Sequence, residues 1–206
     1  EKDIYFSGDF DLINSSFNWS GASLDYEDLA NFQGDIKVTG IENWRTADYS
    51  LQVDTLWYAI KAHDSSLPGL FVQTDTLDLP FDLDSLGGMG FKGVFIGNQN
   101  AFSTQGAFTS SAGNIYANIN STEAENPNFH NINGSIKGTL NHFDNFLGTT
   151  SGIGNLQFYG DFYGSIKDFE SFDLDLDFEV PQIFFHEYNY KNVILKGKAL
   201  NKTFDG

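Results

Sequence analysis

Residues 156–166 read LQFYGDFYGSI, in which leucine, phenylalanine, isoleucine or glycine occupies every second position. Successive side chains of a β-strand point to opposite faces, so these residues would share one face. That face would carry Leu156, Phe158, Gly160, Phe162, Gly164 and Ile166. A glycine leaves a gap in an otherwise apolar surface, which suits either a sharp bend of the sheet or the close approach of another group.

The motif Phe-x-Gly-x-Phe at the centre of this stretch occurs three times. Its copies run from Phe6 to Phe10, from Phe91 to Phe95 and from Phe158 to Phe162. The spacing between the copies varies, so the unit repeats loosely rather than with a fixed solenoid period. We expect one continuous β segment over residues 1–206, with loose repeats beginning near residues 4, 90 and 156 and no domain boundary.

Alternating runs continue outside the motif. They occupy residues 4–12, 32–40, 77–83, 132–140 and 172–180, and the last run sets Asp173, Asp175, Asp177 and Glu179 opposite its apolar residues. One-sided strands of this kind belong to an antiparallel sheet with one dry and one wet face. The sequence therefore predicts an all-β fold, a long antiparallel sheet folded into a trough with an apolar interior. Only residues 54–62 and 25–31 suggest a short helix.

The composition restricts the partners. There are 28 acidic and 11 basic residues, and the formal net charge of −17 argues against nucleic acids and anionic lipid head groups. The absence of cysteine excludes disulfides and thiolate zinc sites, and suits an intracellular or a Gram-negative envelope protein. Because the chain opens at Glu1 directly before a strand and stops at Phe204-Asp205-Gly206, we expect a fragment of a longer protein.

No residue pattern predicts catalysis, a cofactor or a metal site. Residues 88–93 match the dinucleotide-binding glycine fingerprint, but strand residues follow where that motif needs a helix. His63, His130, His142 and His186 are scattered, and the acidic row of 173–179 lacks the single-loop geometry of a calcium site. We expect a solvated strand face there, and no enzyme. Tyr159 and Tyr163 on the wet face are candidates for stacking on sugars.

The chain also resembles a known family. The resemblance lies in residues 39–43 (TGIEN), 67–68, 79–80, 86–87 and 90–93 (GFKG), then 146–148, 188–193 (YNYKNV), 197 and 204–206. These glycines, aromatic residues and alternations are similar to the Bacteroidota branch of the TamB (translocation and assembly module) proteins, within the AsmA-like superfamily. Neither the family's N-terminal anchor nor its C-terminal domain end is present in this sequence.

The resemblance implies a periplasmic protein, anchored to the inner membrane through a segment absent from this chain, whose folded sheet is the "β-taco". Its implied function is to conduct phospholipid between the inner and outer membranes through a hydrophobic β-groove, with a TamA-like or BamA-like outer-membrane barrel as partner. The acyl chains would contact Ile4, Phe6, Phe10, Phe91, Phe95, Leu156, Phe158, Phe162, Ile166, Phe172, Leu174, Leu176 and Phe178.

Two other functions stay open at this point. The first is a chaperone-like module for outer-membrane protein assembly, whose sheet edge pairs with nascent strands. The second is a cell-surface module that binds carbohydrate or protein. It predicts a closed, fully packed core and ligand contacts at Tyr159 and Tyr163 on the wet face.

Overall fold

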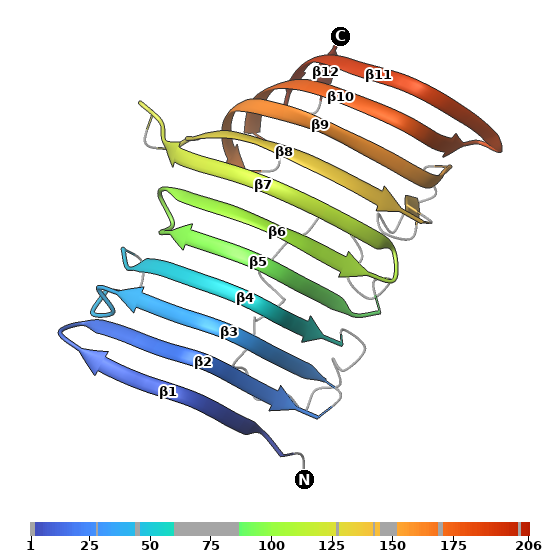
Figure 1. The fold of residues 1–206 in the computed structure, drawn as a ribbon. Coiled ribbons are helices and arrows are strands. Elements are labelled where there is room, and N and C mark those ends of the chain that lie inside the picture. Colours follow the sequence, from blue (N-terminus) through green and yellow to red (C-terminus); the bar gives the residue numbers. More distant parts are fainter. Residues whose placement is uncertain are drawn as a thin grey trace.

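The protein is a single open antiparallel β-sheet in the computed structural model (Figure 1). The structure describes residues 3–27, 29–43, 46–59, 87–126, 128–141, 143–144, 152–168, 171–201 and 203–206. In these residues twelve strands lie in sequence order from β1 to β12, and each strand from β2 to β11 pairs with the strand before it and the strand after it. The predicted all-β fold and long antiparallel sheet are therefore confirmed.

The longest strands are β9 with 16 residues, β10 with 15 and β11 with 13, whereas β1 has 9 and β12 has 3. Their bounds are β1 Tyr5–Ile13, β2 Ser16–Tyr26, β3 Ala30–Thr39, β4 Asp48–Tyr58, β5 Met89–Gly97, β6 Phe102–Ser110, β7 Gly113–Glu123, β8 His130–Leu140, β9 Ile153–Asp168, β10 Ser171–Phe185, β11 Tyr188–Leu200 and β12 Thr203–Asp205.

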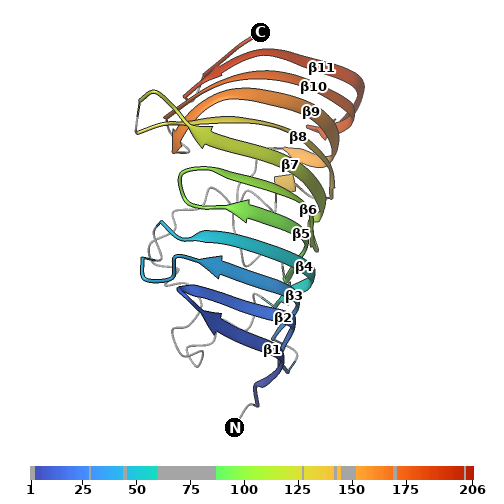
Figure 2. The same ribbon diagram turned by 60° about the vertical axis from the view of Figure 1, so that its left-hand side comes forward.

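The sheet is curved, and within the described residues its end strands β1 and β12 do not pair with each other. Figure 2 shows β9, β10 and β11 bending along their length, while the two chain termini lie at opposite ends of the sheet. Strands bend in this way where right-handed twist accumulates and where glycines and bulges relieve the inner surface. The result is a curved sheet, consistent with a trough, whose edge strands are β1 and β12.

Bulges interrupt the pairing in the first four strands. The register shifts between Trp19 and Ala22 on β2, and between Val53 and Leu56 on β4. At the first of these bulges, the backbone N–H of Gly21 donates to the Asp35 carboxylate at 2.8 Å. An extra residue at each bulge reverses the alternation that follows, so apolar side chains on both sides of the bulge reach the same face.

The two short helices suggested by the sequence are wrong. Residues 54–58 form the end of β4, and residues 25–31 contain the end of β2 and the start of β3. The bulge at Asp54 and Thr55 explains the error at the first site, because it breaks the period of two that identifies a strand. Residues 60–62 and the alternating run at 77–83 lie outside the described residues.

Among the residues that the structure describes, no helix is both long and apolar enough to cross a membrane.

The central glycines bring neighbouring strands close together. A Cβ atom added at Gly93 would contact the backbone O of Gln105, and it would lie 2.6 Å from the Cα of Gly106. These are backbone atoms, which cannot turn aside as a flexible side chain can. Side-chain volume at this position must therefore displace β5 from β6.

We predict that Gly93→Ala lowers the free energy of unfolding by about 1–3 kcal/mol, the usual cost of overpacking a close contact. The measurement is denaturant unfolding of the whole chain. The control is Ser103→Ala on the exposed side of β6, which should change the free energy by no more than about 0.5 kcal/mol. Equal unfolding midpoints for Gly93→Ala and the unsubstituted chain would show that the close approach is not a constraint.

Candidate functional site

The candidate site is the apolar face of the sheet, which the strand register makes continuous. Two rows of large side chains cross β1 to β7 at right angles to the strands. In the first row, directly paired residues are Phe6, Leu24, Phe32, Leu56, Phe91, Phe108 and Ile115. In the second row they are Phe10, Trp19, Ile36, Leu51, Phe95, Thr104 and Ile119.

A third row, of small residues, runs between these two. Its directly paired members on β2 to β7 are Ala22, Gly34, Val53, Gly93, Gly106 and Ala117. Gly8 continues the row on β1, where the pairing shifts between Ser7 and Asp9. We call this set the small-residue row. The glycines of two Phe-x-Gly-x-Phe motifs, Gly8 and Gly93, belong to it.

Large rings of the flanking rows lie over the small-residue row. A Cβ atom at Gly8 would meet the Trp19 indole at 2.5 Å, and one at Gly93 would lie 2.9 Å from Cζ of Phe91. The same arrangement recurs further along the sheet, where a Cβ at Gly160 would lie 2.6 Å from Cγ of Phe178. The gap that a glycine leaves is therefore occupied by a neighbouring aromatic ring.

Trp19 joins the two large rows at the N-terminal end of the sheet. Its ring centroid lies 4.8 Å from that of Phe10, 6.3 Å from Phe6 and 6.2 Å from Phe32. Its indole N–H donates to the backbone O of Ser7 at 3.0 Å. Trp19 is only 8% exposed, so at this end the protein's own side chains fill the space between the rows.

Beyond β7 the face continues with glycines paired to large residues. Gly138 pairs with Phe158, Gly134 with Phe162, and Gly160 with Phe178. On β10 and β11, Leu176 pairs with Gly197 and Phe178 with Leu195. The apolar face thus extends from β1 to β11 without a polar strand.

Much of this face is accessible to solvent. Phe6, Phe10 and Leu12 are 60%, 56% and 68% exposed, and Phe108 near the middle is 50% exposed. The rings of Phe91, Phe95, Phe158 and Phe162 are half-buried. Monomeric soluble proteins seldom leave more than a few hundred Å² of contiguous apolar surface open, which makes this face the candidate site.

The structure places the expected lipid-contacting residues on known strands. Phe6 and Phe10 lie on β1, Phe91 and Phe95 on β5, and the remainder lie on β9 and β10, except Ile4, which precedes β1. On β9 and β10, direct pairs join Phe162 to Leu176, Ile166 to Phe172 and Leu156 to Ile183. Leu174 pairs with Gly164.

Sequence reasoning missed the members of the face on β2, β4, β6 and β7. Trp19 and Leu24 stand on opposite sides of the β2 bulge, and Leu51 and Leu56 on opposite sides of the β4 bulge. A strict period of two assigns such pairs to opposite faces. On β6, the unbroken alternation of Phe102, Thr104, Gly106 and Phe108 indicates a strand with these four residues on one face.

The opposite face of the sheet, called the polar face here, carries most of the charged side chains, together with exposed apolar residues such as Val94, Ile96 and Ile194. The acidic row of β10 is ion-paired with β11, Asp177 with Lys196 at 2.5 Å and Asp173 with Lys198 at 2.9 Å. Hydrogen bonding to these carboxylates raises the pKa of both lysines above the ordinary value. The Tyr159 hydroxyl donates to Glu179, and this hydrogen bond, with a smaller desolvation effect, raises the pKa of Tyr159.

None of these contacts forms a metal or nucleotide site. In the described ranges, no group of three or more His, Asp or Glu side chains is placed to hold a metal ion. Residues 89–97 are strand β5, so the glycine fingerprint at 88–93 leads into a strand and not into a helix. His63 and His142 lie outside the described residues, and His130 contacts the backbone O of Asn100 at 3.0 Å.

Comparison with known proteins identifies no protein similar to this chain. No protein-family description, no curated protein and no solved structure matches this chain. The functional argument therefore depends on the geometry of the two faces.

We predict that Trp19→Ala lowers the free energy of unfolding by about 3–5 kcal/mol, because it removes a buried ring that joins both large rows. The measurement is denaturant unfolding followed by circular dichroism. Ile96→Ala, at a 55% exposed position of β5, is the matched control and should cost far less. A loss for Ile96→Ala as large as that for Trp19→Ala would contradict the assigned packing.

Proposed function

We propose that this chain is a segment of a TamB/AsmA-like envelope protein that conducts phospholipid along its apolar face. The observation that carries the proposal is the continuity and accessibility of that face from β1 to β11. In this proposal the apolar face lines the trough of the curved sheet. Acyl chains then lie against the rings of the two large rows, because those rings already cover the small-residue row.

The energetics favour such a surface for lipid transfer. Burial of one methylene group is worth about 0.8 kcal/mol, so a two-chain lipid with roughly 32 methylenes costs about 26 kcal/mol to bring into water. A barrier of that height corresponds to about weeks per escape. A continuous apolar lining keeps the chains out of water at every step, so transfer needs neither catalysis nor a cofactor.

The polar face supports the same arrangement. Its carboxylates and ion-paired lysines remain solvated, which lets the sheet stand in an aqueous compartment while the apolar face holds acyl chains. In the proposed setting this compartment is the periplasm, the rest of the protein supplies the inner-membrane anchor, and a TamA-like or BamA-like barrel is the partner at the outer membrane.

The test compares two adjacent residues that face opposite ways. A photo-crosslinking amino acid at Phe158, or at Leu176, should capture phospholipid when the protein is expressed in a Gram-negative host and extracted under native conditions. The same group at Tyr159, which is 45% exposed on the polar face, should capture none. The readout is mass spectrometry of the adducts.

A protein that carries no lipid and gives no adduct at Phe158 or Leu176 contradicts the proposal. Equal capture at Phe158 and Tyr159 also contradicts it, because the lipid would then bind non-specifically to both faces of the sheet. Phe158→Asp should reduce the lipid that copurifies, since a charge on the lining is costly to bury against an acyl chain.

A chaperone-like role is the second candidate. It requires an edge strand that pairs with a nascent strand, and β1 is the first strand of the described sheet. Proline substitutions in β1 that block delivery of outer-membrane proteins, while lipid capture at Phe158 is retained, would support this role. The closed, fully packed core that a cell-surface module predicts does not match the open sheet.

A further inference from the structure

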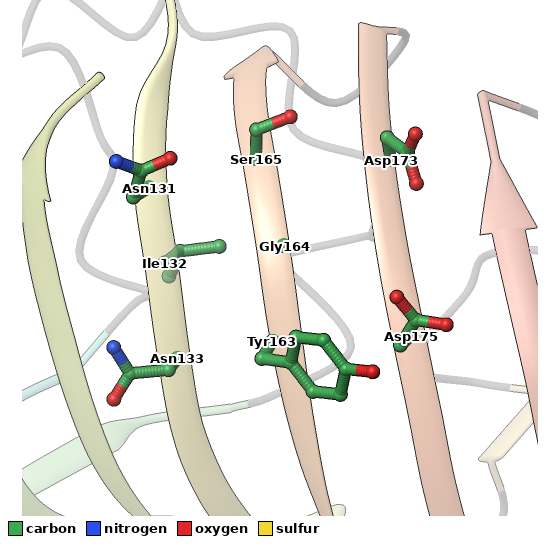
Figure 3. Close-up of a pocket in the computed structure, with 8 residues that line it drawn as sticks. All are labelled: Asn131, Ile132, Asn133, Tyr163, Gly164, Ser165, Asp173 and Asp175. Carbon is green, nitrogen blue, oxygen red and sulfur yellow. The ribbon is translucent and has the colours of Figure 1, made fainter. Parts of the chain in front are cut away.

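A shallow depression of about 460 Å³ lies on the polar face over β8, β9 and β10 (Figure 3). Its side chains form two parallel rows of three across these strands. Asn131, Ser165 and Asp173 are directly paired in one row, and Asn133, Tyr163 and Asp175 in the other. The depression lies on the face opposite to the proposed lipid surface.

Tyr163 stands at the centre of its row and is 62% exposed. Figure 3 shows its ring between Asn133 and Asp175, with Ser165 further along the same strand. A flat, accessible ring of this kind offers apolar contact to a ligand that also needs hydrogen bonds at its rim.

The surrounding groups supply unused hydrogen-bonding capacity. Within the described part of the chain, the side chains of Asn133 and Ser165 make no hydrogen bond to the protein, while Tyr163 interacts electrostatically with the ammonium groups of Lys196 and Lys198. Asn131 donates to the backbone O of Glu123 at 3.2 Å, which leaves its carbonyl oxygen available. Amide groups both donate and accept, and a carboxylate accepts at two oxygens, which matches a ligand rich in hydroxyl groups.

The charges around the depression select against anions. Asp173 and Asp175 line it, and the chain as a whole has a formal net charge of −17. The Lys198 ammonium lies 2.9 Å from the Asp173 carboxylate and offsets part of its charge. The two carboxylates would repel an anionic ligand, and a cationic ligand would compete with Lys198 for the Asp173 carboxylate. An uncharged ligand meets neither obstacle.

We propose that this depression binds an uncharged saccharide. One sugar ring stacks on Tyr163, and its hydroxyl groups bond to Asn133 and Asp175. The inference is independent of the lipid proposal, because it concerns the other face.

A second depression of about 440 Å³ extends the surface along β9. It is lined by Tyr159, Tyr116 and Lys137, and the Lys137 ammonium lies 5.0 Å from the centroid of the Tyr116 ring. Tyr159 and Tyr163 share a face of β9, about 13 Å apart at the rise of an extended strand. The two depressions together therefore suit an oligosaccharide better than a single sugar.

The experiment uses calorimetric titration of the whole chain with cellotetraose, maltotetraose and tetra-N-acetylchitotetraose. At least one of the three should bind saturably, and oligogalacturonate of the same length should not. Tyr163→Ala should weaken binding about tenfold or more, while Tyr163→Phe should keep most of it because the ring remains. Asn133→Ala should also weaken binding.

Tyr188→Ala is the matched control, because Tyr188 is 70% exposed and lies at the start of β11, away from the depression. It should leave the affinity unchanged, and circular dichroism should show the same fold for all variants. The proposal is overturned if none of the three saccharides binds, if Tyr163→Ala binds as well as the unsubstituted chain, or if oligolysine binds at this site and the saccharides do not.

Discussion

The packing of large side chains over small residues of neighbouring strands is the interaction on which this sheet depends. Among the described residues, no second layer of secondary structure packs on the sheet, so its own rings must cover its backbone. Trp19 does so over Gly8, Phe91 over Gly93 and Gly106, and Phe178 over Gly160. This requires each ring to meet a small residue across the strand pair, and hence a fixed register through all the strands.

The bulges follow from the same requirement. A one-residue slip in an antiparallel pair turns every later side chain to the other face. The bulges in β2 and β4 each lie between two apolar residues of the same face, so the alternation resumes with the apolar side chains correctly placed. The same strand register therefore stabilises the sheet and keeps the apolar face continuous.

The alternation within strands was sufficient to predict the fold class and the two faces of strands such as β9 and β10. Alternation does not predict the register between neighbouring strands, so it identifies Gly8 and Gly93 as gaps in an apolar face without revealing the small-residue row that they share. A strict period of two does not place Trp19 on the same face as Leu24, or Leu56 on the same face as Leu51, because a bulge lies within each pair. The ion pairs of Asp173 and Asp177 required partners on β11, which only the register supplies.

Tryptophan fluorescence tests whether acyl chains contact the apolar face. In a Trp44→Phe, Trp57→Phe background, Trp19 on the apolar face is the single remaining tryptophan. Phospholipid brominated on its acyl chains should quench the emission of Trp19, and the same lipid without bromine should not. Unchanged Trp19 emission at saturating brominated phospholipid would contradict this contact.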